Sequence, residues 1–235
     1  MFSTEGLNRV DLLKELSAYL AGFVAQLPVM EVRRGTVILT PDDSRALLYL
    51  IRSGRVQLYK LTPDGKQCTL AILQSGDIFG ETHLFCTGCR RVYASALTDV
   101  LLYGIDGDSF LQLMLDNPRL GMQMLAWTSR RLKETEDLLE QIAYGDVRTR
   151  ILYQLLRLCE DFGEPVEGGC RLNLPLTRQE LASMVAASRE TVSTVLGRLS
   201  REGLVKAERN RWLVRCEQMK SLLGRGDDPA DSWQE

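Results

Sequence analysis

Residues 176–205, LTRQELASMVAASRETVSTVLGRLSREGLV, contain the pattern that decides the fold of the C-terminal part of the chain. Thr177 is predicted to N-cap one helix and Ser188 to N-cap a second, with only residues 186–188 as the turn between them. The inward positions of both helices are apolar: Leu181, Met184 and Val185 in the first, and Val192, Val195, Leu196 and Leu199 in the second. Two short helices joined by such a turn predict a helix-turn-helix.

The polar residues that begin these two helices have the chemistry of DNA contacts. A recognition helix meets base edges with its N-terminal residues, where Arg189 can bond guanine and Glu190 can accept from cytosine N4. The predicted DNA-binding residues are Ser188, Arg189, Glu190, Ser193 and Thr194 at the second helix, and Thr177, Arg178 and Gln179, which suit phosphates, at the first. The alternative interpretation is a solvated charged face on a helical hairpin with a purely structural role.

A small β wing and a local excess of positive charge accompany the two helices. Leu204–Val205, the polar stretch 206–211 and Trp212–Val214 predict a hairpin. Residues 176–215 contain eight basic and four acidic residues, a local charge of +4, whereas the whole chain has a net charge of −2. A basic C-terminal module on an acidic body favours local contact with DNA phosphates over attraction of the whole molecule.

The composition of the 235 residues is that of an ordinary globular protein, with 45% hydrophobic and 26% charged residues. No apolar run approaches the ~20 residues of a membrane span, and the N-terminus lacks a basic-then-apolar signal pattern. We therefore expect a cytoplasmic protein with no membrane partner. A chain of this size in that compartment needs no disulfides, so most of its six cysteines are expected to be small buried side chains.

The N-terminal part of the chain predicts β structure. Short β-rich runs, separated by turn signals, occur at residues 37–40, 47–51, 55–61, 68–73 and 100–105. Many short strands at this spacing are typical of a sandwich or barrel. Asp64-Gly65 stands between two of the runs and predicts a tight hairpin turn.

A long helix is predicted from Pro118 to about Ala143, where glycine is rare. Residues recur there at heptad spacing: Leu125, Leu132 and Leu139, with Thr128, Thr135 and Ile142 between them. This seam favours a parallel coiled-coil dimer interface. The alternative is a single amphipathic helix that lies on the β domain.

The remainder of the chain completes an α+β architecture in three parts. Asp146 is predicted to N-cap a helix over residues 147–162, and GEPVEGG at 163–169 is predicted to be a loop. We expect a sensor domain over residues 1–107, a dimerisation helix and hinge over 108–145, and a DNA-binding domain over 146–235.

The helix-turn-helix closely resembles that of the CRP/FNR family of bacterial transcription regulators, and the resemblance extends over residues 29–215. Gly54-Arg55-Val56, the segment GDIFGE at 76–81 and the long helix that ends before Asp146 fall in family order. The resemblance implies an N-terminal β-roll (a cyclic-nucleotide-binding-like jelly roll), a long dimerisation helix and a C-terminal winged helix-turn-helix. It also implies a homodimeric activator that binds double-stranded DNA and works with RNA polymerase.

The same resemblance assigns roles within the helix-turn-helix. Arg189 and Glu190 would contact bases, and Ser193 with Thr194 would adjust specificity. Many relatives carry Arg where this chain has Thr194, which leaves the inner bases of the half-site open. Ala186 stands where the turn usually has Gly, at a cost of about 1 kcal/mol if its φ is positive.

An effector site is expected by resemblance in the loop that follows Phe79. Its candidate residues are Gly80, Glu81, Arg90 and Arg91, with Thr135 and Glu136 on the long helix. The effector would be cyclic AMP or another small anion; the stretch RLKETEDLLE also resembles nitrogen regulators that bind 2-oxoglutarate. A regulator without any diffusible ligand is a further alternative.

Redox, metal or haem sensing is another alternative for the sensor. His83, Cys86 and Cys89 place three soft ligands within seven residues, although a loop with two ordinary cysteines explains the same spacing. No metal site is predicted. An enzyme is disfavoured because His83 is the single histidine and because nucleophile-elbow and phosphate-loop motifs are missing from the sequence.

Overall fold

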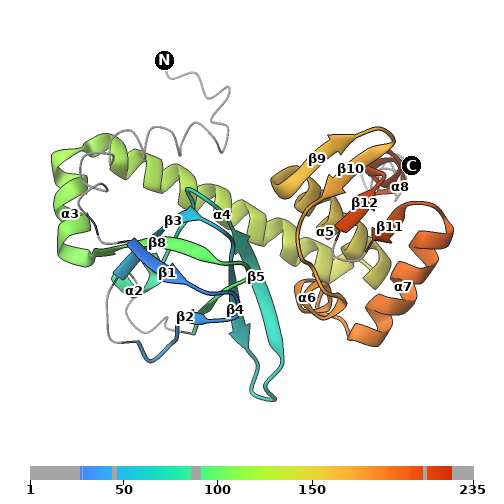
Figure 1. Cartoon of the computed structure of the whole chain (residues 1–235), viewed down its shortest axis with the longest axis horizontal. Helices are drawn as coiled ribbons and strands as arrows, with labels where there is room; N and C mark the ends of the chain where they lie inside the picture. The colour runs from blue at the N-terminus through green and yellow to red at the C-terminus, as the bar shows by residue number, and fades with distance from the viewer. Residues whose placement is uncertain (1–26, 28, 44–46, 86–90, 209–210, 224–235) are drawn as a thin grey trace, which may run out of the picture. The chain divides into compact units, whose positions relative to one another are not determined.

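The computed structural model describes residues 27, 29–43, 47–85, 91–208 and 211–223, and it divides the chain into two compact units, residues 1–133 and 134–235. Each unit has its own sheets and helices (Figure 1). No helix in these described ranges is both long enough and apolar enough to span a membrane.

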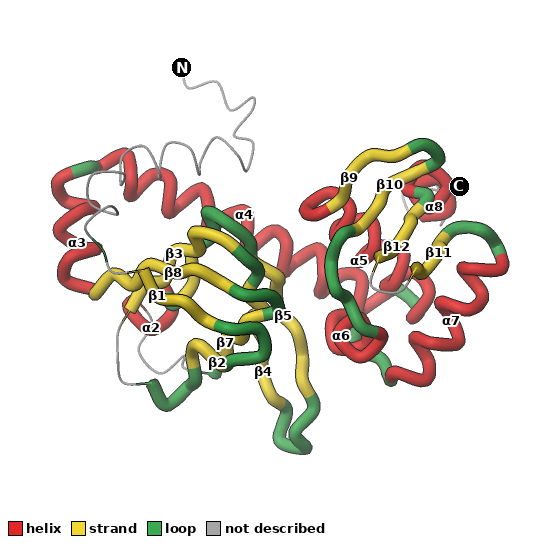
Figure 2. Tube along the Cα trace, in the orientation of Figure 1, coloured by secondary structure: helices red, strands yellow, loops and turns green. Residues whose placement is uncertain are grey.

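The first unit contains two antiparallel sheets of four strands each (Figure 2, yellow). One sheet has the order β1-β8-β3-β6, formed by Val29–Val32, Val100–Asp106, Leu47–Ser53 and Ile78–Phe79. The other has the order β2-β7-β4-β5, formed by Val37–Leu39, Tyr93–Ala96, Val56–Leu61 and Gln67–Leu73. Alternate side chains of both sheets fill the space between them, among them Leu39, Ile51, Val56, Leu58, Phe79 and Leu102.

The sequence pattern predicts five of the eight strands that the structure describes in this unit, namely β2, β3, β4, β5 and β8. The hairpin at Asp64-Gly65 is confirmed, because β4 pairs antiparallel with β5 and Gly65 has a φ of +78°. The backbone N–H of Thr62 donates to the carbonyl of Lys66 at 2.9 Å and closes the turn. The other strands, β1, β6 and β7, have four residues or fewer and owe their conformation to their partners.

Three helices complete the first unit: α2 (Glu81–Phe85), α3 (Gly107–Asp116) and the start of α4 (Pro118–Tyr144). Asp106 caps α3 by accepting from the backbone N–H of Ser109 at 2.9 Å. A second apolar core joins the outer face of the β3–β8 sheet to these helices, and its buried residues include Leu48, Leu50, Ile105, Phe110, Leu120, Met124 and Trp127. The first turns of α4 therefore lie on the β domain.

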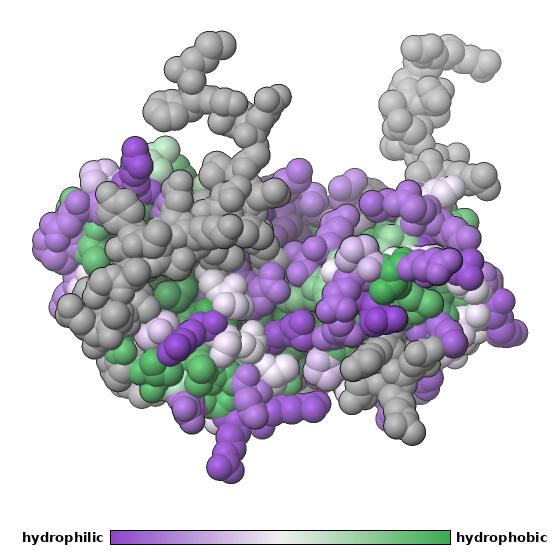
Figure 3. All heavy atoms as spheres, turned by 45° about the horizontal axis from the view of Figure 1, so that its top comes forward, coloured by the Kyte–Doolittle hydropathy of each residue, from purple (hydrophilic) through white to green (hydrophobic). Residues whose placement is uncertain are grey.

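The other stripe of α4 is exposed in a single chain. Leu125, Leu132, Leu139 and Ile142 are exposed by 61%, 59%, 65% and 40%. Figure 3 shows hydrophobic and hydrophilic residues interspersed over one face of the molecule. One stripe of the helix thus packs on the sheet, as the second interpretation predicts, and the heptad stripe is left uncovered by the described residues, so the dimer interface stays a prediction.

The second unit is a winged helix. Its helices are α5 (Val147–Phe162), α6 (Arg178–Met184), α7 (Arg189–Arg201) and α8 (Cys216–Leu223). Its sheet has the order β11-β12-β10-β9, formed by Val205–Glu208, Arg211–Val214, Gly169–Leu172 and Gly163–Val166. The predicted cap is confirmed, since Asp146 accepts from the backbone N–H of Thr149 at 2.7 Å. The α+β fold class is also confirmed.

The prediction of a loop over residues 163–169 is wrong. These residues form β9, the turn and the first residue of β10, and β10 pairs with both β9 and β12. The turn needs its glycines, because the Cβ of any other residue at 169 would lie 2.3 Å from the carbonyl of Val214. Proline and glycine in GEPVEGG are typical of a loop and therefore misled the prediction. The segment is a strand because it pairs with β10, which is held in place by its buried side chains Cys170 and Leu172.

Candidate nucleic-acid interface

Both helices of the helix-turn-helix begin at the predicted caps. Thr177 and Glu180 form a reciprocal capping box: the N–H of Thr177 donates to Glu180 Oε2 at 2.6 Å, and the N–H of Glu180 donates to Thr177 Oγ1 at 3.1 Å. Ser188 caps α7, because its Oγ accepts from the N–H of Thr191 at 3.1 Å. These bonds fix where each helix starts and which residues occupy its first turn.

The apolar face of α7 determines which side chains face solvent. Val192, Leu196 and Leu199 are buried, together with Leu181, Met184 and Val185 of the facing segment. Val195, predicted to be buried, is only half-buried. On the opposite side Arg189, Glu190 and Thr194 are exposed, as is the cap Ser188, while Ser193 is half-buried. The structure therefore brings the five second-helix candidates to one helix start and one exposed face.

Thr194 differs from its neighbours because its hydroxyl already has a partner. Its Oγ1 donates to the carbonyl of Glu190 at 3.0 Å, four residues earlier in the same helix. The hydroxyl can then still accept a hydrogen bond from a base, and the methyl group allows apolar contact. Arg178 and Gln179, in the first turn of α6, are both exposed, and so is the Thr177 cap.

The turn between the helices includes a strained residue. Ala186 has a φ of +48°, and no other non-glycine residue in the described ranges has a positive φ. The positive φ means that the cost of about 1 kcal/mol considered for alanine at this position applies. Its carbonyl accepts a 3.5 Å hydrogen bond from Arg150 Nη1 of α5, which helps to hold the turn in place.

An ion pair anchors the far end of α7. Arg148 of α5 donates to both carboxyl oxygens of Glu202, at 2.8 and 2.6 Å. This hydrogen bonding lowers the pKa of Glu202 and raises that of Arg148. The pair is partly exposed, so its main effect is to set the direction of α7 relative to α5.

The predicted wing is confirmed as the antiparallel pair β11–β12. Trp212 of β12 donates from Nε1 to the carbonyl of Leu176 at 3.3 Å, which ties the wing to the segment that precedes α6. Arg209 and Asn210, at the tip, lie outside the described residues.

The candidate effector residues of the first unit lie where β6 meets α2. Gly80 has a φ of +95°, and a Cβ there would lie 2.3 Å from the carbonyl of Leu47. Glu81 begins α2 and is half-buried, and its Oε2 is buried with no hydrogen-bond partner among the described residues. A buried acceptor in this state costs about 1–3 kcal/mol, which a ligand that donates to it would offset.

The remaining effector candidates are not all described. Arg91 is exposed, just before β7. Thr135 and Glu136 are exposed on the part of α4 that belongs to the second unit. Arg90, Cys86 and Cys89 lie outside the described residues, so the cysteine-based alternative receives no structural account.

One cluster of functional side chains was not predicted from the sequence. Cys159, Cys170 and Cys216 come together in the second unit from three different elements. Burial raises the pKa of the thiols of Cys159 and Cys216. Eleven and forty-six residues separate these cysteines along the chain, so no short motif signals their proximity.

Two family models match the chain: the cyclic nucleotide-binding domain over residues 29–117 and the Crp-like helix-turn-helix domain over residues 149–224. The CRP-like cAMP-activated global transcriptional regulator of Mycobacterium tuberculosis is 32% identical over 195 residues, which are 83% of this chain and 87% of that protein. The global nitrogen regulator of Synechocystis is 36% identical over 191 residues, 80% of this chain and 84% of that protein.

Solved structures of similar regulators share the fold. A mutant of CooA from Carboxydothermus hydrogenoformans has a TM-score of 0.74 at 27% identity and covers 86% of this chain and 90% of its own. The c-di-GMP-responsive regulator CLP of Xanthomonas campestris has a TM-score of 0.72 at 28% identity and covers 84% and 98%. These relatives are regulators of transcription and not enzymes.

Replacing Ala186 by glycine is expected to stabilise the second unit. Relief of the left-handed conformation is worth about 1–2 kcal/mol, and the added freedom of the unfolded chain offsets about 0.4–1 kcal/mol of it. Urea unfolding should therefore show Ala186→Gly to be more stable by about 0.5–1 kcal/mol. Ala187→Gly, whose φ is not positive, is the matched control and should gain nothing; equal effects of the two variants would contradict the assignment of strain to Ala186.

Proposed function

The chain belongs to the CRP/FNR family of transcription regulators, and we propose that it binds a palindromic operator as a homodimer under the control of a small effector in its β-roll. The observation that carries this proposal is the capped, packed α7, which presents Arg189 and Glu190 to solvent. We propose three functional parts: a sensor over residues 1–107, a dimerisation helix and hinge over 108–145, and a DNA-binding domain over 146–235.

The DNA contacts follow from the two helix starts. Arg189 donates to guanine, and Glu190 accepts from a cytosine on the complementary strand. Ser193 and Thr194 adjust the choice of neighbouring bases. The first turn of α6, together with the cap of α7, contacts phosphates through Thr177, Arg178, Gln179 and Ser188.

Dimerisation uses the heptad stripe of α4. Its members are Leu125, Thr128, Leu132, Leu139 and Ile142, and the four apolar ones are exposed in a single chain. Large exposed apolar side chains at seven-residue spacing on one helix favour a second copy of the same helix as their partner. Two recognition helices in such a dimer reach half-sites about one helical turn, ~34 Å, apart.

The effector is a small anionic molecule, with cyclic AMP as the first candidate. The carbonyl of Leu47 fills the space beside Gly80, so this glycine lets β3 and the start of α2 approach closely, and the unpartnered oxygen of Glu81 next to it suits a donor such as a sugar hydroxyl. Arg90, Arg91, Thr135 and Glu136 complete the proposed set. The Mycobacterium relative is named as cAMP-activated, which supports this choice, whereas the resemblance of the stretch RLKETEDLLE to nitrogen regulators keeps 2-oxoglutarate as an alternative.

The protein acts in the cytoplasm as an activator that contacts RNA polymerase when bound to its operator. The second candidate function is a regulator of the same fold that needs no effector, or that responds to oxidation of Cys86 and Cys89. The redox form of that candidate rests on the spacing of these two cysteines with His83, which a loop with two ordinary cysteines also explains.

Calorimetric titration with cyclic AMP, cyclic GMP and 2-oxoglutarate tests the effector site. Glu81→Gln removes the charge of the acceptor and should weaken cyclic AMP binding about tenfold or more, about 1.4 kcal/mol. Glu31→Gln, an exposed carboxyl in the same unit, should bind as the wild type does. If no ligand binds and operator affinity is already high, the effector-free function replaces this one. If oxidant alters operator affinity and Cys86→Ser abolishes the change, the redox-controlled function replaces the effector-controlled one.

Leu132→Lys should convert the dimer into monomers and weaken operator binding, because it places a charge in the centre of the seam. Sedimentation equilibrium measures the change. Lys133→Glu alters an exposed position beside the seam and should leave the dimer intact. A Leu132→Lys protein that stays dimeric and binds DNA normally rules out this seam.

Arg189→Ala and Arg178→Ala should weaken DNA binding in different ways. Loss of Arg189 should cost about 1–3 kcal/mol and relax discrimination at one base pair. Loss of Arg178 should weaken all operators about equally and reduce the salt dependence, because its contact is to phosphate. The measurement is binding of each variant to a panel of single-base operator changes at two salt concentrations.

The opposite pattern of effects would mean that the two helices have been assigned the wrong roles. If neither substitution changes affinity, DNA recognition by this surface is ruled out.

A further inference from the structure

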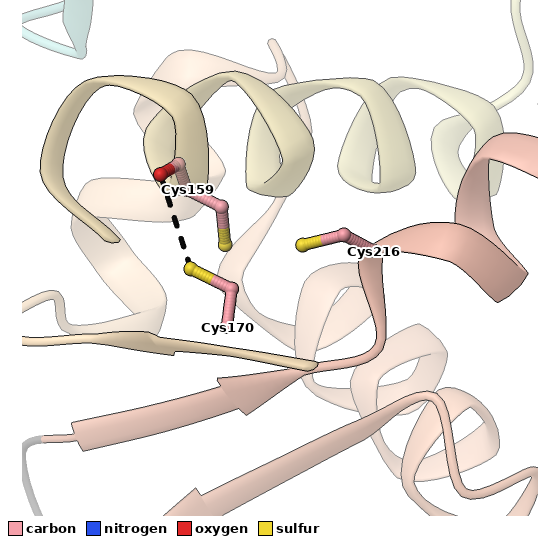
Figure 4. Close-up of side chains that lie close together, drawn as sticks. All are labelled: Cys159, Cys170 and Cys216. Atoms are coloured by element: carbon pink, nitrogen blue, oxygen red, sulfur yellow. Dashed lines mark hydrogen bonds between the residues drawn. The ribbon is translucent and has the colours of Figure 1, made fainter. Parts of the chain in front are cut away.

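The second unit contains three cysteine side chains that point toward one another (Figure 4). Cys159 comes from the last turn of α5, Cys170 from β10 and Cys216 from the start of α8. Their three Sγ atoms all lie within 4.8 Å of one another. Cys159 and Cys170 are buried, and Cys216 is half-buried. We propose that this cluster is a binding site for a thiolate-preferring metal ion of the class of Zn²⁺ or Cu⁺.

The spacing of the sulfur atoms fits a shared ion better than a direct bond between two of them. A metal–sulfur distance of about 2.3 Å places the sulfur atoms of a tetrahedral or trigonal site roughly 3.8–4.0 Å apart. A disulfide requires about 2.05 Å and leaves the third thiol without a role. Movements of less than about 1 Å therefore suffice to bring all three cysteines onto one ion.

The surrounding backbone keeps space for the sulfur atoms. A Cβ at Gly163 would lie 2.1 Å from the Sγ of Cys170 and 2.4 Å from the carbonyl of Cys159. Any side chain at residue 163 would thus occupy the position of a ligand atom. The cluster also borders a pocket of about 570 Å³, which gives an ion and a water molecule a route to the sulfur atoms.

The pocket lining carries charges of both signs. Three thiolates with one Zn²⁺ carry a net charge of −1, which the nearby Arg215 and Lys220 can offset. Glu160 and Glu217 also line the pocket, but the cluster among the described residues consists of the three cysteines, so a water molecule from the pocket would supply the fourth ligand that Zn²⁺ needs, whereas Cu⁺ is satisfied by three sulfur atoms. Soft thiolates select these ions over Mg²⁺ or Ca²⁺.

Binding exchanges protons for the metal ion. Without metal, the thiol of Cys170 donates to the carbonyl of Cys159 at 3.9 Å, and that of Cys216 donates to the carbonyl of Val214 at 3.7 Å. Coordination breaks the three S–H bonds, releases the three protons to solvent and forms three metal–sulfur bonds, with no change in oxidation state. The ion then links α5, β10 and α8. Of these, α5 also holds the recognition helix α7, through the bond from Arg148 to Glu202.

The test uses the full-length protein with Cys86→Ser and Cys89→Ser, which removes the other closely spaced cysteines. Titration with Co²⁺, as a coloured substitute for Zn²⁺, should give a thiolate-to-metal charge-transfer band that saturates at one ion per chain and is displaced by Zn²⁺. A parallel anaerobic titration with Cu⁺ identifies which of the two ions binds more tightly. The unfolding temperature should rise when the site is filled.

Single substitutions in this background assign the ligands. Cys216→Ser should weaken Co²⁺ binding at least tenfold, whereas Cys68→Ser, at an exposed cysteine of the first unit, should leave it within twofold of the parent. Circular dichroism checks that each variant is folded. A parent protein that shows no charge-transfer band with Co²⁺ and binds no Cu⁺ overturns the proposal, whether or not the Cys216→Ser variant folds. So does a folded Cys216→Ser variant that binds Co²⁺ as the parent does.

Discussion

The recognition helix α7 has a single orientation because its buried side chains must fill the core of the second unit. Val192, Leu196 and Leu199 lie on one face and leave the polar residues no freedom to rotate inward. The Ser188 cap fixes the N-terminal end, and the bidentate pair of Arg148 with Glu202 fixes the other. A base-contacting side chain on a helix held at both ends loses less entropy on binding DNA than one on a mobile loop.

The long helix α4 has two functional faces that differ in rotation about its axis. Leu120, Met124 and Trp127 form the stripe that packs on the β domain. At 3.6 residues per turn, the centre of the heptad stripe lies roughly 100° around the helix from that stripe. One stripe of this helix therefore finds its packing partner within the chain. The heptad stripe finds no partner among the described residues of the same chain. This explains why periodicity alone supported two interpretations.

The elements that could be predicted from the sequence are those whose determinants are local. The caps Thr177 and Ser188 and the turn at Asp64-Gly65 all depend on residues within a few positions. Strand β9 could not be predicted, because its conformation comes from pairing with β10, which in turn pairs with β12 more than forty residues later. The cluster of Cys159, Cys170 and Cys216 was hidden for the same reason, since only the folded sheet and helices bring its members together.

The same distinction applies to the effector site and bears on the choice of ligand. Gly80 and Glu81 are adjacent in sequence, so the family resemblance could propose a ligand position near β6 from a short segment. The chemistry of the ligand depends on the hydrogen bonding of Glu81, which only the structure describes. A buried carboxyl oxygen without a partner among the described residues attracts a hydroxyl donor, whereas it repels a second carboxylate. We therefore favour a sugar-containing anion over a dicarboxylate, because its hydroxyl groups satisfy Glu81 while its negative charge lies away from that acceptor.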